Sequence, residues 1–75
     1  MASSAKGGYI LAVEKSSDPS FKSFELIVCS QSENNAVNVA ERQNGRQYQY
    51  KIIRSATESE IERYALDEDE CTAFD

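Results

Sequence analysis

Two strand-like stretches lie close together near the start of the chain, and the short gap between them limits how the chain can fold. Residues 9–15 and residues 21–29 both alternate apolar side chains between the two faces of an extended strand. The gap reads Ser-Ser-Asp-Pro-Ser, and its Pro19 cannot donate a hydrogen bond to a neighbouring strand. A connection this short joins adjacent antiparallel strands. The sequence therefore predicts a β-hairpin.

Two later stretches carry the signals of helices. Residues 31–43 follow Ser30, which stands three residues before a glutamate as in a capping box, and Ser32 is a competing cap. The Asn-Gly pair that comes next is a common helix stop. Residues 57–66 begin with a second capping-box spacing at Thr57 and continue with an apolar stripe. We expect a helix in each stretch.

Residues 46–54 alternate polar and apolar side chains, as a half-buried strand does, and lie between the two helical stretches. The predicted fold class is α+β, a small ββαβα domain over residues 9–66. Its three-stranded, mostly antiparallel sheet has the order 2-1-3, with both helices on one face and the other face partly open. Residues 1–8 are expected to form a flexible arm and residues 67–75 an acidic tail.

The charge of the chain is divided unevenly along its length. The net charge is −5, yet residues 58–75 hold eight acids against one base, a net charge of −7. The first 57 residues hold five acids and seven bases, a net charge of +2. Such a division is typical of a protein with one acidic interaction surface.

The residue types limit the chemistry that the chain can perform. It has no histidine, which is the commonest general base, and no glycine-rich phosphate loop. Asp67, Asp69 and Asp75 resemble three ligand positions of a calcium loop, but the required glycine and the final glutamate are missing. We expect no enzymatic activity, no cofactor and no dedicated metal site.

The cysteines and the apolar runs indicate where the protein resides. Cys29 stands in an apolar run and is predicted to be a core residue, whereas Cys71 stands among acids and is predicted to be exposed. No apolar run approaches the ~20 residues that span a bilayer, and no signal peptide is recognisable. We expect a cytoplasmic protein with reduced cysteines and no membrane partner.

The leading functional hypothesis is a protein-binding module that uses its acidic surface. Carboxylates spaced on a rigid scaffold imitate phosphates and fit a basic groove meant for nucleic acid. The partner would be a larger protein or nucleoprotein complex with a basic surface. The alternative is an acidic segment that only keeps the protein soluble. The candidate partner-binding residues are Glu58, Glu62, Asp67, Glu68, Asp69 and Glu70.

A second hypothesis is a module that binds single-stranded nucleic acid, because arginine and lysine residues flank the aromatic residues of the third predicted strand. It requires the tyrosines to face solvent, and the competing interpretation places them on the core face of the sheet. The net charge of −5 also opposes direct binding of nucleic acid. The candidate residues are Arg46, Tyr48, Tyr50, Lys51 and Arg54.

A third hypothesis is a structural subunit that forms a homodimer or an assembly through its sheet. In size, acidity and element order the chain resembles small phage-encoded inhibitors and accessory proteins. This resemblance implies an inhibitory binding role and assigns no role to any single residue.

Overall fold

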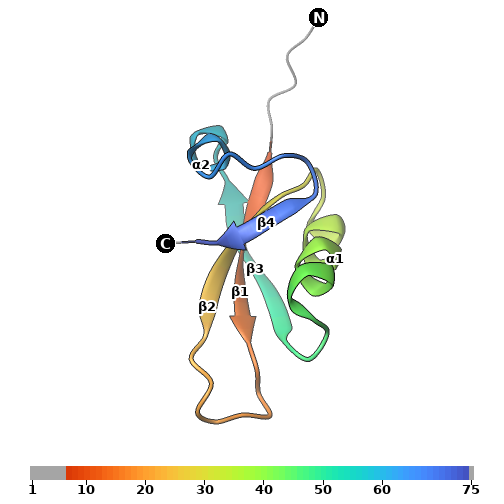
Figure 1. The fold of residues 1–75 in the computed structure, drawn as a ribbon, viewed down its shortest axis with the longest axis vertical. Coiled ribbons are helices and arrows are strands. Elements are labelled where there is room, and N and C mark those ends of the chain that lie inside the picture. Colours follow the sequence, from red (N-terminus) through yellow and green to blue (C-terminus); the bar gives the residue numbers. More distant parts are fainter. Residues whose placement is uncertain (1–6, 75) are drawn as a thin grey trace, which may run out of the picture.

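The computed structural model describes residues 7–74 and contains four strands and two helices (Figure 1). All strand pairs are antiparallel, and the sheet has the order β3-β1-β2-β4. The domain is therefore of the α+β class. In chain order the elements are β1 (Gly8–Glu14), β2 (Phe24–Cys29), α1 (Glu33–Asn44), β3 (Gln49–Ala56), α2 (Glu58–Arg63) and β4 (Glu70–Ala73).

The predicted hairpin and the placement of the third strand are confirmed. β1 pairs with β2 from Gly8 opposite Cys29 to Val13 opposite Phe24. β3 lies on the other side of β1, which gives the predicted order for these three strands. Of the predicted arm, Gly8 belongs to β1, Gly7 is exposed and precedes the strand, and residues 1–6 lie outside the described residues.

The prediction of three strands is wrong, because part of the expected acidic tail forms β4 beside β2. Val28 pairs with Cys71, and Leu26 pairs with Ala73. The N–H of Phe74 donates to the carbonyl oxygen of Glu25 at 2.9 Å. Backbone hydrogen bonds to the otherwise open edge of β2 thus hold this segment in place, although its acidic composition is typical of a solvated tail.

The prediction that both helices cover one face is also wrong. α1 packs its buried residues against Leu11 and Val28, whereas Ile61 of α2 packs with Ile10 and Ile27. Successive side chains of a strand point to opposite faces, so the two helices lie on opposite sides of the sheet. The apolar stripe of a helix shows that it packs against the sheet, but not on which side.

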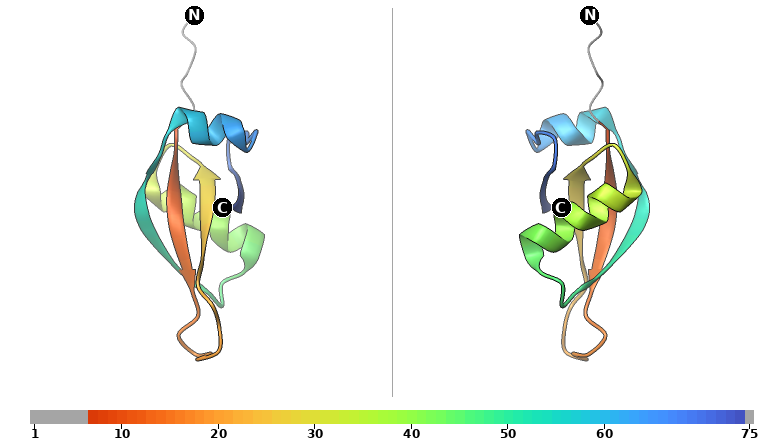
Figure 2. Two further views of the ribbon diagram at one scale, coloured as in Figure 1. Left: turned by 90° about the vertical axis from the view of Figure 1, so that its left-hand side faces the viewer. Right: turned by 90° about the vertical axis from the view of Figure 1, so that its right-hand side faces the viewer.

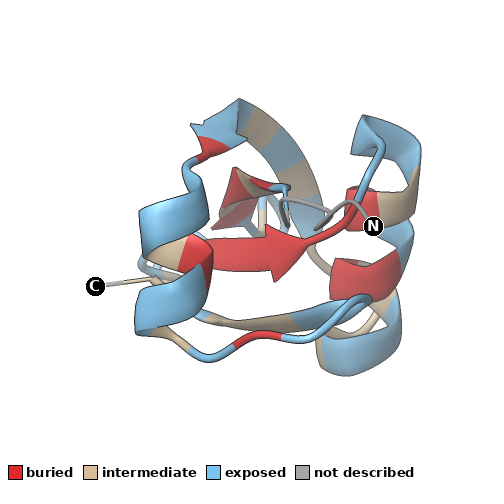
Figure 3. Cartoon of the chain, turned by 90° about the horizontal axis from the view of Figure 1, so that it is seen from above, coloured by how far each residue is buried: buried red, intermediate tan, exposed pale blue. Residues whose placement is uncertain are grey.

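The two inner strands, β1 and β2, are mostly buried (Figure 3), because α1 covers one face of the sheet and α2 covers part of the other. α1 runs along one face, and α2 lies across the upper end of the sheet (Figure 2). α2 is only six residues long, so it covers that end and leaves the rest of its face open. On this open part, Ala12 is half-buried, and Lys51, which pairs with it, is exposed.

The two cysteines follow the strand alternation. Cys29 is a core residue, as predicted, and is buried with Ile10, Ile27 and Ile61 in what we call the α2 cluster. Cys71 is half-buried against Leu11, Val28 and the buried residues of α1, which we call the α1 cluster, so the prediction that it is exposed is wrong. Both side chains are thiols. Burial raises the pKa of the Cys71 thiol, which keeps it protonated and weakly reactive at neutral pH.

Gly8 allows α2 to approach the sheet. A Cβ atom at this position would lie 2.7 Å from Cδ1 of Ile61 and would press on the carbonyl oxygen of Val28. Ile61 is fully buried and Val28 belongs to the rigid backbone of β2, so neither atom yields easily. A glycine is therefore required where β1 passes beneath α2.

We predict that Gly8→Ala lowers the free energy of unfolding by about 1–3 kcal/mol, the usual cost of overpacking a core. Gly7→Ala is the matched control, because a Cβ at Gly7 would meet nothing within 4 Å. Urea unfolding followed by circular dichroism measures both variants. Equal stability of the two variants would contradict the packing described for Gly8.

Candidate functional site

The acidic residues singled out from the sequence lie along one end of the molecule. Glu58 and Glu62 are one helical turn apart on α2, and both are exposed. The chain then crosses the same end of the sheet before it enters β4 (Figure 1). Asp67, Glu68 and Asp69 lie in this crossing segment, Glu70 is the first residue of β4, and all four are exposed. We call these six residues the acidic end.

The crossing segment is a hydrogen-bonded turn, which the sequence had not indicated. The N–H of Glu70 donates to the carbonyl oxygen of Asp67 at 3.1 Å, and Oε1 of Glu70 accepts from the N–H of Asp67 at 2.8 Å. Asp69 adopts a left-handed conformation with φ 63°, which aspartate tolerates better than most residues. Its N–H donates to the carbonyl oxygen of Cys29 at 2.9 Å, so the turn is fixed to the end of β2.

Asn35 fixes the turn to α1 as well. Its Nδ2 donates to Oδ1 of Asp69 at 2.6 Å and to Oγ of Ser30 at 2.8 Å. Ser30 is buried, and the helix cap is Ser32, whose Oγ accepts from the N–H of Asn35 at 3.1 Å. The competing cap is thus the correct one, and Ser30 instead joins the network behind the acidic turn. The sequence alone gave no signal for the contact between Asn35 and Asp69, which are 34 residues apart.

α2 is held by a capping box and an ion pair. Oγ1 of Thr57 accepts from the N–H of Glu60 at 3.2 Å, and Oε1 of Glu60 accepts from the N–H of Thr57 at 2.9 Å, as predicted from the spacing. Arg54 donates to the two carboxylate oxygens of Glu60 at 2.9 and 2.8 Å. These hydrogen bonds, with that from the N–H of Thr57, lower the pKa of Glu60 to about 2. The ion pair connects α2 to β3.

The residues proposed for nucleic-acid binding are divided between the two faces of the sheet. Tyr48 and Tyr50 are half-buried against the α1 cluster, and the hydroxyl of Tyr50 donates to the carbonyl oxygen of Gly45 at 2.6 Å. Lys51 points to the opposite face, as the alternation of β3 requires. The tyrosines thus lie on the core face, and these side chains form no common stacking platform.

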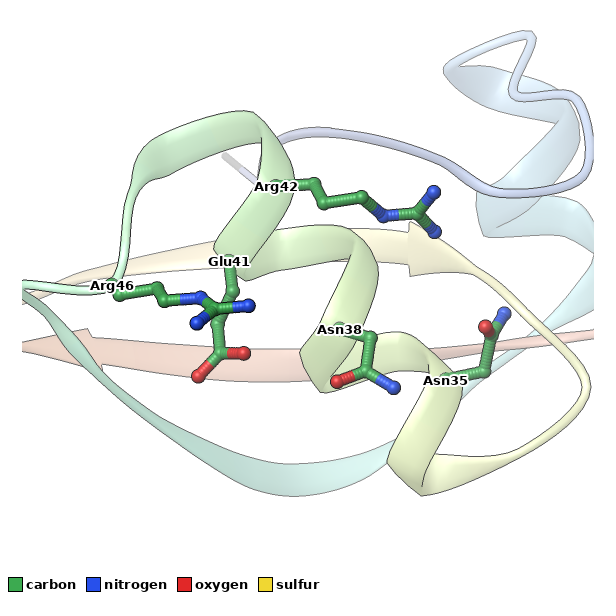
Figure 4. A pocket seen from close by; sticks show the side chains of 5 residues that line it. All are labelled: Asn35, Asn38, Glu41, Arg42 and Arg46. Carbon is green, nitrogen blue, oxygen red and sulfur yellow. The ribbon is translucent and has the colours of Figure 1, made fainter.

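The two arginines of that set are also separated from the tyrosines. The guanidinium of Arg54 binds Glu60 and lies 5.8 Å from the ring centre of Phe74. Arg46 precedes β3 and lines a polar hollow of about 290 Å³ on the outer side of α1 (Figure 4). The two arginines therefore lie apart, and they do not form one site that could bind a phosphate group together.

The hollow on α1 carries both signs of charge. Figure 4 shows the guanidinium of Arg46 beside the carboxylate of Glu41, with Arg42 extending along the other side of the helix. Asn35, at its far end, is engaged with Ser30 and Asp69. Opposite charges so close together favour neither an anion nor a cation, so this hollow does not define a ligand.

Neither a metal-binding cluster nor a membrane-spanning helix occurs in the part of the chain that the structure describes. Across residues 7–74, no three or more cysteine or acidic side chains are gathered in a way that could hold a metal ion. Neither described helix has the length and apolar character needed to cross a bilayer.

We predict that Glu60→Gln lowers the melting temperature at neutral pH and that the deficit disappears in acid. A carboxyl whose pKa falls from 4.5 to about 2 on folding stabilises the fold above pH 4.5, and this stabilisation is lost as the pH falls toward 2. Thermal unfolding of both proteins across this range tests the prediction. Glu62→Gln, on the same helix, is the control, and a deficit independent of pH would contradict the role of Glu60.

Comparisons of this chain with protein-family models, with curated proteins and with solved structures found no match. The features that bear on its function are the six carboxylates of the acidic end, the hydrogen-bonded turn and the capped helix α2.

Proposed function

We propose that the protein is a non-enzymatic binding module that docks its acidic end on a basic groove of a larger protein or nucleoprotein complex. A groove of this kind normally receives nucleic acid, so a docked acidic end would exclude nucleic acid and act as an inhibitor. The observation that carries the proposal is that the acids at 67–70 belong to a turn fixed by Cys29 and Asn35. The proposal places the encounter in the cytoplasm.

Rigidity is what separates this role from that of a solubilising tail. A flexible acidic tail loses conformational entropy when it binds, which weakens the complex. Here the turn is already ordered by backbone hydrogen bonds, and α2 by its capping box at Thr57. Carboxylates held in fixed positions present a defined pattern of negative charge, as a nucleic-acid backbone does.

The electrostatic character of the surface favours rapid, salt-sensitive association. Residues 58–70, which hold seven acids and one base, lie along one end of the molecule, while the first 57 residues of the sequence carry a net charge of +2. Complementary charge steers the encounter and raises the association rate at low salt. Such a complex weakens as the ionic strength rises, because exposed charges are screened.

We predict that replacing Asp67, Glu68, Asp69 and Glu70 by their amides weakens partner binding roughly fivefold to several hundredfold. Four exposed ion pairs contribute about 1–4 kcal/mol in total. The test is capture of partners from a cell lysate by immobilised protein. A duplex DNA competitor is added to learn whether the captured protein is displaced from a nucleic-acid groove.

The matched control removes four acids elsewhere, so that the net charge changes equally. Capture should persist with this control and be lost with the first variant. Equal capture by both variants, or a captured complex that resists both salt and duplex DNA, would contradict the proposal. The control replaces Glu14, Glu25, Glu33 and Glu41 by glutamine.

A further inference from the structure

β3 forms one edge of the sheet, and its outer side faces solvent. In the order β3-β1-β2-β4, β3 has β1 on one side, and no other strand of residues 7–74 pairs with its outer side. Both views of Figure 2 show β3, in teal, as the outermost strand of the sheet. At eight residues it is also longer than the four-residue β4 at the opposite edge. Its outward N–H and C=O groups are therefore available to a further strand.

The side chains of β3 differ sharply between its two faces. Tyr50 and Ile52 are half-buried on the α1 face, next to the core. Gln49 and Lys51 are exposed on the opposite face. Cross-strand neighbours interact through side chains on the same face, so an added strand would need apolar residues on one side and polar residues on the other.

Basic residues outnumber acids along this edge. β3 carries Lys51 and Arg54 and no acid, while Glu14 of β1, which pairs with Gln49, lies on the same face. Lys51 projects from the middle of β3, whereas Arg46, three residues before the strand, lies beside Glu41 (Figure 4). Arg54 is engaged by Glu60, so Lys51 is the charge best placed to meet an added strand. An acidic strand complements this edge, and a basic strand is repelled by it.

The same charges act against pairing with a second copy of the chain. Two β3 strands side by side would bring their basic side chains together, because neither strand contains an acidic residue. The register of β3 against β1 also shifts between Ile10 and Leu11, which bends the strand near Ile53. Lysines and irregularities of this kind are common devices that prevent edges from joining their own kind.

We propose that β3 binds an extended acidic peptide segment of another protein, which adds to the sheet as a fifth strand. Its acids would alternate with apolar residues, so that the acids meet Lys51 and the apolar side chains meet Tyr50 and Ile52. The segment pairs with β3 up to Ile52, before the shift in register. The β4 edge is unsuited to it, because Glu70 and the acids before it would repel the segment. This site is separate from the acidic end.

The test uses a blocked peptide, Thr-Glu-Val-Glu-Val-Glu-Thr, and isotope-labelled full-length protein. Two control peptides are used, Thr-Lys-Val-Lys-Val-Lys-Thr and the scrambled Thr-Val-Val-Glu-Glu-Glu-Thr. With the acidic alternating peptide, alternate amides of β3 should shift in the NMR spectrum and exchange more slowly with solvent. Neither control peptide should produce this pattern.

Charge reversal gives the sharper result. Lys51→Glu should weaken binding of the acidic peptide roughly twofold to thirtyfold, because an opposite-charge pair becomes a like-charge pair. The same substitution should create binding of the lysine peptide, because the new glutamate would meet lysines of opposite charge. Lys22→Glu, in the exposed loop between β1 and β2, is the matched control and should leave both peptides unaffected.

Three results would overturn the proposal. The first is that the amide shifts caused by the acidic peptide map away from β3. The second is that Lys51→Glu and Lys22→Glu have equal effects on peptide binding. The third is that, without peptide, the protein self-associates through β3 as its concentration rises, which would appear as an increase in its molecular mass in solution. The variant with amides at 67–70 should still bind the peptide. A failure at β3 is thereby distinguished from a failure of the acidic end.

Discussion

The pairing of β1 with both β2 and β3 is the constraint on which the rest of the domain depends. It buries Ile10 on one face and Leu11 and Val13 on the other, each at 1% exposure or less. A shift of one residue would exchange the faces and move Gly8 from beneath Ile61. The register therefore fixes where α1 and α2 dock. A 75-residue chain gains most of its stability from this thin, two-sided core.

The sequence predicted local structure better than tertiary placement. The hairpin, both helices and the capping box at Thr57 followed from spacing, because these signals act over a few residues. β4 was missed because hydrogen bonds to the edge of β2 outweigh the polar composition around Cys71. The side on which α2 docks was missed because a helical stripe has no information about the face it meets. For the candidate site, the exposure of Glu58 was predictable, whereas the contact between Asn35 and Asp69 joins distant parts of the chain.

The two proposed surfaces have opposite charge and depend on different elements. The acidic end is formed by α2 and the turn before β4, and the basic edge by β3. Arg54 and Glu60 join the two, because their ion pair runs from β3 to α2. This pair also removes one base from the edge and leaves Glu60 outside the acidic surface. This neutralised pair lies between the carboxylates of the acidic end and Lys51 of β3, and so separates two regions of opposite charge.

The contact of Asn35 with both Ser30 and Asp69 has a consequence for local unfolding. β4 is only four residues long and lies at an edge of the sheet, so its detachment is an opening of low cost. The hydrogen bonds of Asn35 couple this opening to the first turn of α1. Fraying of that helical turn would break the side-chain hydrogen bond to Asp69 and leave the acidic turn held by its backbone hydrogen bonds to β2 alone. An amide in the middle of the sequence thus adds to the order of the acidic end, and its loss would make the detachment of β4 easier.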